Sequence, residues 1–301
     1  MHRRSNEQMK LPMRALGGHG CLLEPGPWDA AAVARTTQAH EFCIWPLAVE
    51  EKGKRTAHQS VVSPQSAALI AESFTAGRPL IPLLDHAGPA AFAWMKERAY
   101  GPSERWVHPT GRRPLGLTRE LWEGRVEAYL NASETLLRAG VQTAIVGMHH
   151  DGLLAAALSP VMNPDATEPE RFLEPLNIFR KLQDRWASLG ACFALEEVCP
   201  GGRDPTEGIA FAQCLEQEGA HGLWLAGGTA LFPPGYARFT NLSGDSGDLW
   251  LTTAQWVCGH VKIPLWAVGK THDPQVALAR ATKRGLRGIT VTVAGSQEVK
   301  T

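Results

Sequence analysis

From about residue 80 onward, short apolar runs alternate regularly with amphipathic segments, and this pattern narrows the possible folds. The apolar runs end in Gly, His or acidic residues and occupy 79–88, 141–149, 190–198, 222–228, 262–269 and 288–295. An earlier run of the same kind, GCLLEPG, occupies 20–26. Strands that are apolar on both faces are typical of parallel sheets buried between helices.

The segments between these runs predict helices at 118–140, 174–190, 204–220 and 273–285. Three of them begin at Thr118, Asp204 and Asp273, which are good N-caps, and end at or next to a glycine. The alternation favours an α/β fold, a (β/α)₈ TIM-type barrel, over an open doubly wound sheet. We expect a single barrel domain over residues 1–301.

Two segments lack this alternation, 27–60 and 229–253, and we interpret both as long loops or lids of the barrel. The second is rich in Gly, Pro and Ser.

The composition argues against several classes of partner. The 30 basic and 30 acidic residues cancel, so nothing favours nucleic acid or an anionic membrane. No stretch approaches the roughly 18 consecutive apolar residues of a membrane span. The six cysteines show no CxxC spacing, which predicts reduced thiols in a cytoplasmic protein and neither a disulfide framework nor a zinc site.

In a barrel of this type, functional side chains lie where the strands end. Those positions hold Asp85, His86, His149, His150, Glu196, Glu197, Gly227, Gly228, Lys270 and Ser296. The adjacent pair His149 and His150 is a poor metal site, because neighbouring side chains on a strand point to opposite faces. We therefore assign no metal ligands.

One stretch, AGVQTAIVGMHHDGLLAAALSPVMNP at 139–164, resembles the fourth strand and following loop of the Old Yellow Enzyme (NADH:flavin oxidoreductase) family. Family members read AG-x-D-x-V-E-I-H-x-A-H-G-Y-L-L, then F-L-S-P and N-x-R. PLIPLLDHAGP at 79–89 resembles their Q-L-x-H-A-G-R strand, and 199–229 and 261–295 resemble later β/α units. RALGGHGCLLEPG at 14–26 is similar to the end of the first helix and the second strand.

The resemblance covers about residues 14–295 and implies an FMN-dependent oxidoreductase fold. It also implies that the first strand of the barrel is missing. The two strands beside the gap would then have unpaired edges. Three explanations stay open: the N-terminal residues fill the gap irregularly, a homo- or hetero-oligomeric partner covers it, or the chain is a fragment.

The resemblance also implies which side chains hold the flavin, and most of them are replaced. Leu83 stands for the glutamine that faces the flavin, and Ala194, Pro89 and Ser296 stand for three arginines. In the substrate motif, the replacements are Gly147 for the first histidine, Gly152 for the tyrosine and Asp165 for the arginine of N-x-R, whereas His150 keeps the second histidine.

Each charge-assisted hydrogen bond contributes about 1.5–3 kcal/mol, so these losses remove on the order of 5 kcal/mol or more of FMN affinity. Lys270 and main-chain NH groups at strand ends would recover part of it. The candidate cofactor-binding positions are His86, Gly228, Gly269, Lys270 and Gly295.

Three functions follow as hypotheses. The first is a barrel with an eroded FMN site, a pseudoenzyme that serves as a non-catalytic partner subunit or as a repurposed small-molecule-binding or non-redox protein. The alternative is an active FMN-dependent NAD(P)H oxidoreductase of activated alkenes. The third is a metal-assisted hydrolase or lyase that uses His86, His149, His150, Asp85 and Glu196.

For any reaction at the mouth of the barrel, we predict a small-molecule ligand and His150 as acid/base or carbonyl ligand. Glu196 and Asp85 are the nearest candidate carboxylates.

Overall fold

The alternation of strands and helices builds a closed parallel barrel. The computed structural model describes residues 13–16, 18–23, 30–54, 59–91, 99–104, 113–149, 152–228, 242 and 244–293. Eight strands close in the order β1-β10-β9-β8-β7-β6-β3-β2. They are β1 Gly18–Leu23, β2 Phe42–Ala48, β3 Leu80–Asp85, β6 Thr143–Met148, β7 Ser188–Ala194, β8 Leu223–Ala226, β9 Leu265–Gly269 and β10 Gly288–Val293. The short strands β4 Tyr100–Gly101 and β5 Leu115–Gly116 form a separate pair.

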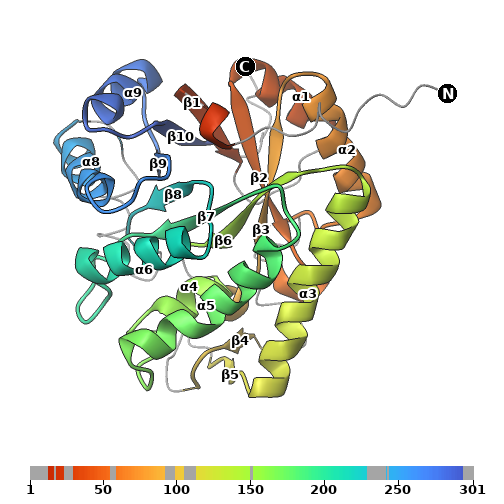
Figure 1. Cartoon of the computed structure of the whole chain (residues 1–301), viewed down its shortest axis with the longest axis vertical. Helices are drawn as coiled ribbons and strands as arrows, with labels where there is room; N and C mark the ends of the chain where they lie inside the picture. Colours follow the sequence, from red (N-terminus) through yellow and green to blue (C-terminus); the bar gives the residue numbers. More distant parts are fainter. Residues whose placement is uncertain are drawn as a thin grey trace, which may run out of the picture.

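Helices surround the barrel in sequence order, from α1 round to α9 (Figure 1). They are α1 Ala30–Ala39, α2 Pro64–Thr75, α3 Arg119–Arg138, α4 Leu153–Leu158, α5 Glu168–Gln183, α6 Pro205–Gln217, α8 Gly244–Cys258 and α9 Pro274–Lys283. The described residues also form the 3₁₀ turns η2 Met13–Ala15, η3 Glu51–Gly53 and η4 Gly88–Ala90. The predicted (β/α)₈ barrel is therefore confirmed.

The expectation of a missing first strand is wrong. β1 pairs with β10, Gly18 opposite Gly288, and on its other side with β2. The run at 20–26 therefore belongs to the first strand, and Phe42–Ala48 is the second. The barrel has no open seam between these strands, which removes the reason for which an oligomeric partner was expected.

The interpretation of 27–60 as a long loop is also wrong, because this segment contains α1 and β2. Two features conceal β2 in the sequence. It contains Pro46, and proline is rare inside strands. Only residues 40 and 41 separate it from α1, which leaves no room for a recognisable turn signal.

The second predicted loop, 229–253, is wrong in its last part. Residues 244–253 belong to α8, whereas 229–241 and 243 lie outside the described residues.

The predicted helix starts are confirmed at three positions. The side chain of Thr118 accepts from the Leu121 N–H at 3.3 Å, and Asp273 accepts from Val276 at 3.1 Å. Asp204 accepts from the N–H groups of residues 206 and 207 at 2.8 and 3.0 Å. The helix expected over 174–190 instead runs from Glu168 to Gln183, because the Glu170 carboxylate caps the Thr167 N–H at 2.7 Å and starts it earlier.

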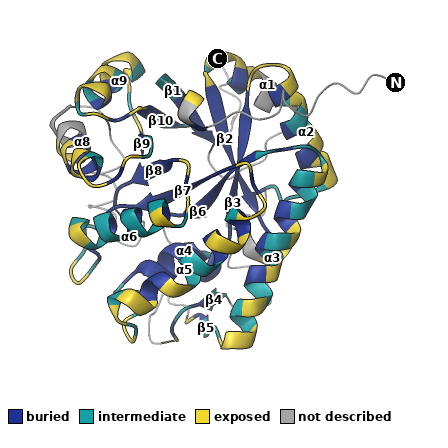
Figure 2. Cartoon of the chain, viewed as in Figure 1, coloured by how far each residue is buried: buried dark blue, intermediate teal, exposed yellow. Residues whose placement is uncertain are grey.

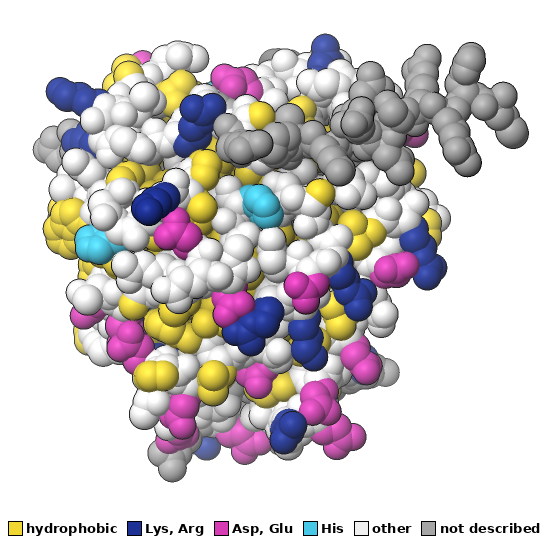
Figure 3. All heavy atoms as spheres, in the orientation of Figure 1, with side chains coloured by type: hydrophobic (Ala, Val, Ile, Leu, Met, Phe, Trp, Pro, Cys, Tyr) yellow, Lys and Arg dark blue, Asp and Glu magenta, His cyan; other side chains and the backbone are white. Residues whose placement is uncertain are grey.

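The core lies inside the barrel and between the barrel and its helices. Figure 2 shows the strands buried and the helices exposed along their outer faces. The face seen in Figure 3 carries acidic and basic side chains interspersed. Within the described part of the chain, no helix has the length and apolar character needed to cross a membrane.

Candidate functional site

The candidate site is the mouth of the barrel, where the eight strands end. Phe193 of β7 packs on Phe211 of α6, with ring centroids 5.4 Å apart, so Phe193 faces outward. Its neighbours Cys192 and Ala194 therefore face the interior, because side chains alternate along a strand. Gly147 of β6 lies opposite Cys192 and shares that interior face.

Asp85 is the last residue of β3 and is buried, with 1% of its surface exposed. A Cβ atom on Gly147 would lie 3.3 Å from its Oδ1 and 2.6 Å from Cδ2 of Leu83. Burial, and then the charge of Asp85, raise the pKa of the Cys192 thiol. Asp85, Gly147 and Cys192 thus meet at one place, and Cys192 is a member that the sequence did not predict.

His86 belongs to a second group, which joins three elements. Its Nδ1 accepts from the Gly88 N–H at 2.9 Å, so Nε2 carries the proton and donates to Oε1 of Glu50 at 2.9 Å. Arg125 of α3 donates to the same carboxylate oxygen. Its guanidinium carbon lies 5.2 Å from the centre of the Tyr100 ring. Both ring nitrogens of His86 are therefore engaged within the protein.

The charges in this group act on Glu50. Burial raises the pKa of its carboxyl, but the hydrogen bond and electrostatic attraction from His86 and the positive charges of Arg125 and Lys52 outweigh burial and hold the pKa below its usual value. The sequence does not indicate these partners, because Glu50 lies 36 residues from His86 and 75 residues from Arg125.

Across the mouth, the loop after β7 is organised by Arg203, which is 2% exposed. Its guanidinium donates to the carbonyl of Ala194 and reaches that of Leu158 at 3.5 Å. Its main-chain N–H donates to Oε2 of Glu197 at 3.0 Å. Burial lowers the pKa of Arg203, which Glu197 and Glu207 partly offset. The guanidinium still stays protonated.

The carboxylates of this loop differ in their surroundings. Glu197 is buried, with 3% of its surface exposed, whereas the predicted Glu196 is half-buried. Next to them, Val198 has a φ of 51°, in the left-handed region that β-branched residues rarely adopt. The chain therefore turns sharply where it leaves β7.

The helix α4 connects these two groups. All six of its residues are buried. The Leu153 N–H at its start donates to the His86 carbonyl at 2.7 Å, and the Leu158 carbonyl at its end is the one that Arg203 approaches. The apolar run after the two histidines is thus a buried helix that ties the turn after β3 to the loop after β7.

The other predicted residues lie around the same mouth. His149 follows β6 and is 4% exposed, whereas His150 lies outside the described residues. The Gly228 N–H donates to the Glu196 carbonyl at 3.0 Å. Gly269 ends β9, and Lys270 follows it with an exposed side chain. Gly295 also lies outside the described residues.

The described residues offer no cluster of metal ligands for the hypothesis of a metal-assisted hydrolase or lyase. Among residues that the structure describes, no three His, Cys, Asp or Glu side chains are arranged to hold a metal ion.

Solved structures share this architecture. 2-Naphthoyl-CoA reductase in complex with 2-naphthoyl-CoA matches with a TM-score of 0.77 at 16% identity. Morphinone reductase in complex with tetrahydroNAD matches at 0.69 and 14%, over 91% of this chain and 82% of that one. The old yellow enzyme homologue from Zymomonas mobilis matches at 0.70 and 12%, over 92% and 84%. This chain has the Old Yellow Enzyme fold.

The resemblance read from the sequence motifs is thus confirmed at the level of the fold. The chain spans about half of 2-naphthoyl-CoA reductase, 47% of that chain, although the match covers 90% of this one. No protein-family model and no curated protein matches the sequence.

Proposed function

We propose that this Old Yellow Enzyme-like barrel has lost ordinary FMN redox chemistry. It serves instead as a repurposed small-molecule-binding or non-redox protein, or as a non-catalytic partner subunit. If the protein binds a small molecule, we expect that ligand to lie at the barrel mouth.

The observation that supports this proposal most strongly is that the Arg203 guanidinium is buried and bound to main-chain carbonyls. The family resemblance expects an arginine directed at the flavin from the Ala194 position. Here the guanidinium beside Ala194 comes from Arg203, and it donates to a main-chain carbonyl of β7 and approaches another at the end of α4. Because these contacts hold it in place and it is buried, this cation is poorly placed to bind a ligand's anionic group.

Other described residues support the same conclusion. Leu83, at the position expected to hold a glutamine, is fully buried and apolar. Pro89, at the position of a second arginine, is also buried. The Gly228 N–H, a possible phosphate donor, already serves the Glu196 carbonyl. These residues do not fit a flavin, and a loss of about 5 kcal/mol corresponds to more than about a thousandfold in affinity.

The test is FMN binding by the purified full chain. We would incubate it with excess FMN, desalt it, and record its visible spectrum beside a flavin-containing member of the Old Yellow Enzyme family treated identically. We expect this chain to emerge colourless and the control to stay yellow. A stoichiometric flavin band on this chain would contradict the proposal.

That opposite result would favour the alternative, an active FMN-dependent NAD(P)H oxidoreductase of activated alkenes. The fold it shares with reductases is the specific observation in its favour. In that reading Lys270 and main-chain groups would hold the flavin, and His150 would bind the substrate's carbonyl oxygen. Lys270→Met should then release FMN, and His150→Ala should weaken binding of an enone such as cyclohexenone without releasing FMN.

A further inference from the structure

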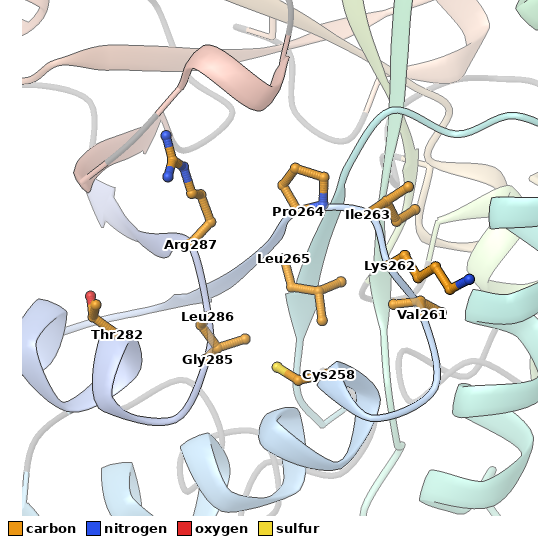
Figure 4. A pocket seen from close by; sticks show the side chains of 10 residues that line it. All are labelled: Cys258, Val261, Lys262, Ile263, Pro264, Leu265, Thr282, Gly285, Leu286 and Arg287. Atoms are coloured by element: carbon orange, nitrogen blue, oxygen red, sulfur yellow. The ribbon is translucent and has the colours of Figure 1, made fainter.

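A hollow lies at the opposite end of the barrel from the mouth. It is a groove of about 690 Å³ between the loop that enters β9 and the loop that enters β10 (Figure 4). That volume lies within the range of small-molecule sites. Its lining residues are Cys258, Val261, Lys262, Ile263, Pro264, Leu265, Thr282, Gly285, Leu286 and Arg287.

Three buried apolar side chains form the floor of the groove. Val261, Leu265 and Leu286 are 7%, 3% and 2% exposed. Figure 4 shows Leu265 near the centre of the view, with Lys262 and Arg287 toward opposite sides. The three floor side chains expose little surface themselves, so the apolar surface that a ligand between the two cations would cover lies chiefly on the half-buried Cys258, Ile263 and Pro264. Covering it favours a ligand with an apolar body.

The charge of the lining has one sign. It includes two cations, Lys262 and Arg287, and no Asp or Glu. Lys262 forms no ion pair with any residue in the described part of the chain, and its side chain is exposed. The adjoining stretch 280–287 carries four basic residues and no acidic one, in a protein whose net charge is zero. This local excess of positive charge is complementary to an anion.

Several main-chain carbonyls at the helix ends beside the groove already accept hydrogen bonds. At the end of α9, the carbonyls of Ala281 and Thr282 accept from main-chain N–H groups of residues 284–286. At the end of α8, the Val257 carbonyl accepts from residues 260 and 261. The nearby Glu216 carboxylate accepts the N–H groups of Lys262 and Ile263 at 2.6 and 3.2 Å.

We propose that this groove binds a small amphipathic carboxylate, with its hydrocarbon body against Cys258, Ile263 and Pro264 over the buried floor and its carboxylate at Lys262. The proposal does not depend on the function of the barrel mouth. It commits to a ligand with both parts, because the floor alone would accept any apolar molecule and the cations alone any small anion.

The experiment is calorimetric titration of the full chain with octanoate, 1-octanol and inorganic phosphate as probes. We expect saturable one-to-one binding of octanoate, with 1-octanol and phosphate at least about tenfold weaker. Lys262→Met keeps most of the side-chain stem but removes the charge, and it should weaken octanoate binding about tenfold. Lys181→Met, which changes an exposed lysine of α5, is the matched control and should leave binding unchanged.

A second variant locates the site. Thr282 is exposed at the rim, so Thr282→Trp can fill the groove without altering the buried floor. We expect it to abolish octanoate binding while the thermal unfolding midpoint is kept. Equal affinity for octanol, equal affinity for phosphate, no octanoate binding, or binding that survives Thr282→Trp would each overturn the proposal.

Discussion

At the scale of single residues, the Glu50 carboxylate joins three elements at the mouth of the barrel. Its carboxylate follows β2 and accepts from His86 after β3 and from Arg125 on α3. The oxygen that both groups use is Oε1, so one carboxylate fixes the imidazole tautomer and neutralises a half-buried guanidinium. Its removal would leave the Arg125 charge without this partner, which costs more than the loss of an exposed pair.

We predict that Glu50→Gln lowers the free energy of unfolding by about 1.5–3 kcal/mol at neutral pH, the range for hydrogen bonds to charged groups. The lowered pKa of Glu50 means that its contribution is fully present above the unfolded-state pKa and is lost as pH falls through the folded-state pKa. Urea unfolding of both proteins should therefore show a gap that narrows as the pH is lowered below about 4.

The control for this prediction is Glu123→Gln. Glu123 pairs with Arg119 at 3.3 Å, but the two side chains are 67% and 94% exposed. An exposed pair contributes about 0–1 kcal/mol. A loss for Glu50→Gln no larger than that for Glu123→Gln, or a gap independent of pH, would show that the His86–Glu50–Arg125 group is not a stabilising one.

At the scale of elements, adjacent strands of the barrel combine large aromatics with glycines. Trp224 of β8 and Trp266 of β9 stack with ring centroids 4.4 Å apart and planes at 8°. Both are fully buried. Gly190 of β7 and Gly222 leave room for them, since a Cβ atom at either position would lie 2.7–2.8 Å from an indole carbon. The strands can approach one another only because these side chains are absent.

We predict that Gly190→Ala lowers the free energy of unfolding by about 1–3 kcal/mol, the usual cost of overpacking a core. Its Cβ would lie 2.8 Å from the Met13 sulfur, the Gly222 carbonyl oxygen and a Trp224 ring carbon. Gly124→Ala in α3 is the matched control, because nothing lies within 4 Å of that Cβ. It should stabilise the protein by about 0.5–1 kcal/mol. Urea unfolding of both variants should give opposite signs, and equal shifts would refute this packing argument.

At the scale of the whole molecule, closure of the barrel determines which of the six cysteines meet solvent. Cys21, Cys43 and Cys192 are buried, and Cys199, Cys214 and Cys258 are half-buried. Burial is the largest cause of the raised pKa of each of these half-buried thiols. The thiolate is the reactive form, so they should react slowly at neutral pH and faster as the pH rises.

Titration with Ellman's reagent measures this directly. We predict that the folded protein exposes no more than the three half-buried thiols, and that all six react after unfolding in guanidinium. Peptide mapping identifies which cysteines are modified. Modification of Cys21, Cys43 or Cys192 in the folded protein, at the rate of the others, would contradict the closed barrel.

The sequence predicts which residues lie at the strand ends, but it does not predict which distant residues bind them. Asp85 and His86 were expected at the mouth and lie there, because a buried strand followed by polar residues is a local signal. Glu50 and Arg203 were missed as site residues. The former lay in a segment interpreted as a loop, and nothing near the latter in sequence reveals that Ala194 and Leu158 accept from it.

From about residue 80 onward, local sequence predicts the alternation of strands and helices, because apolar periodicity and helix caps depend on residues within a few positions of one another. Closure of the barrel between β1 and β10, with Gly18 opposite Gly288, becomes evident in the folded structure alone. The same holds for the group formed by Glu50, His86 and Arg125. Such contacts depend on register between distant segments and on burial, which local periodicity does not encode.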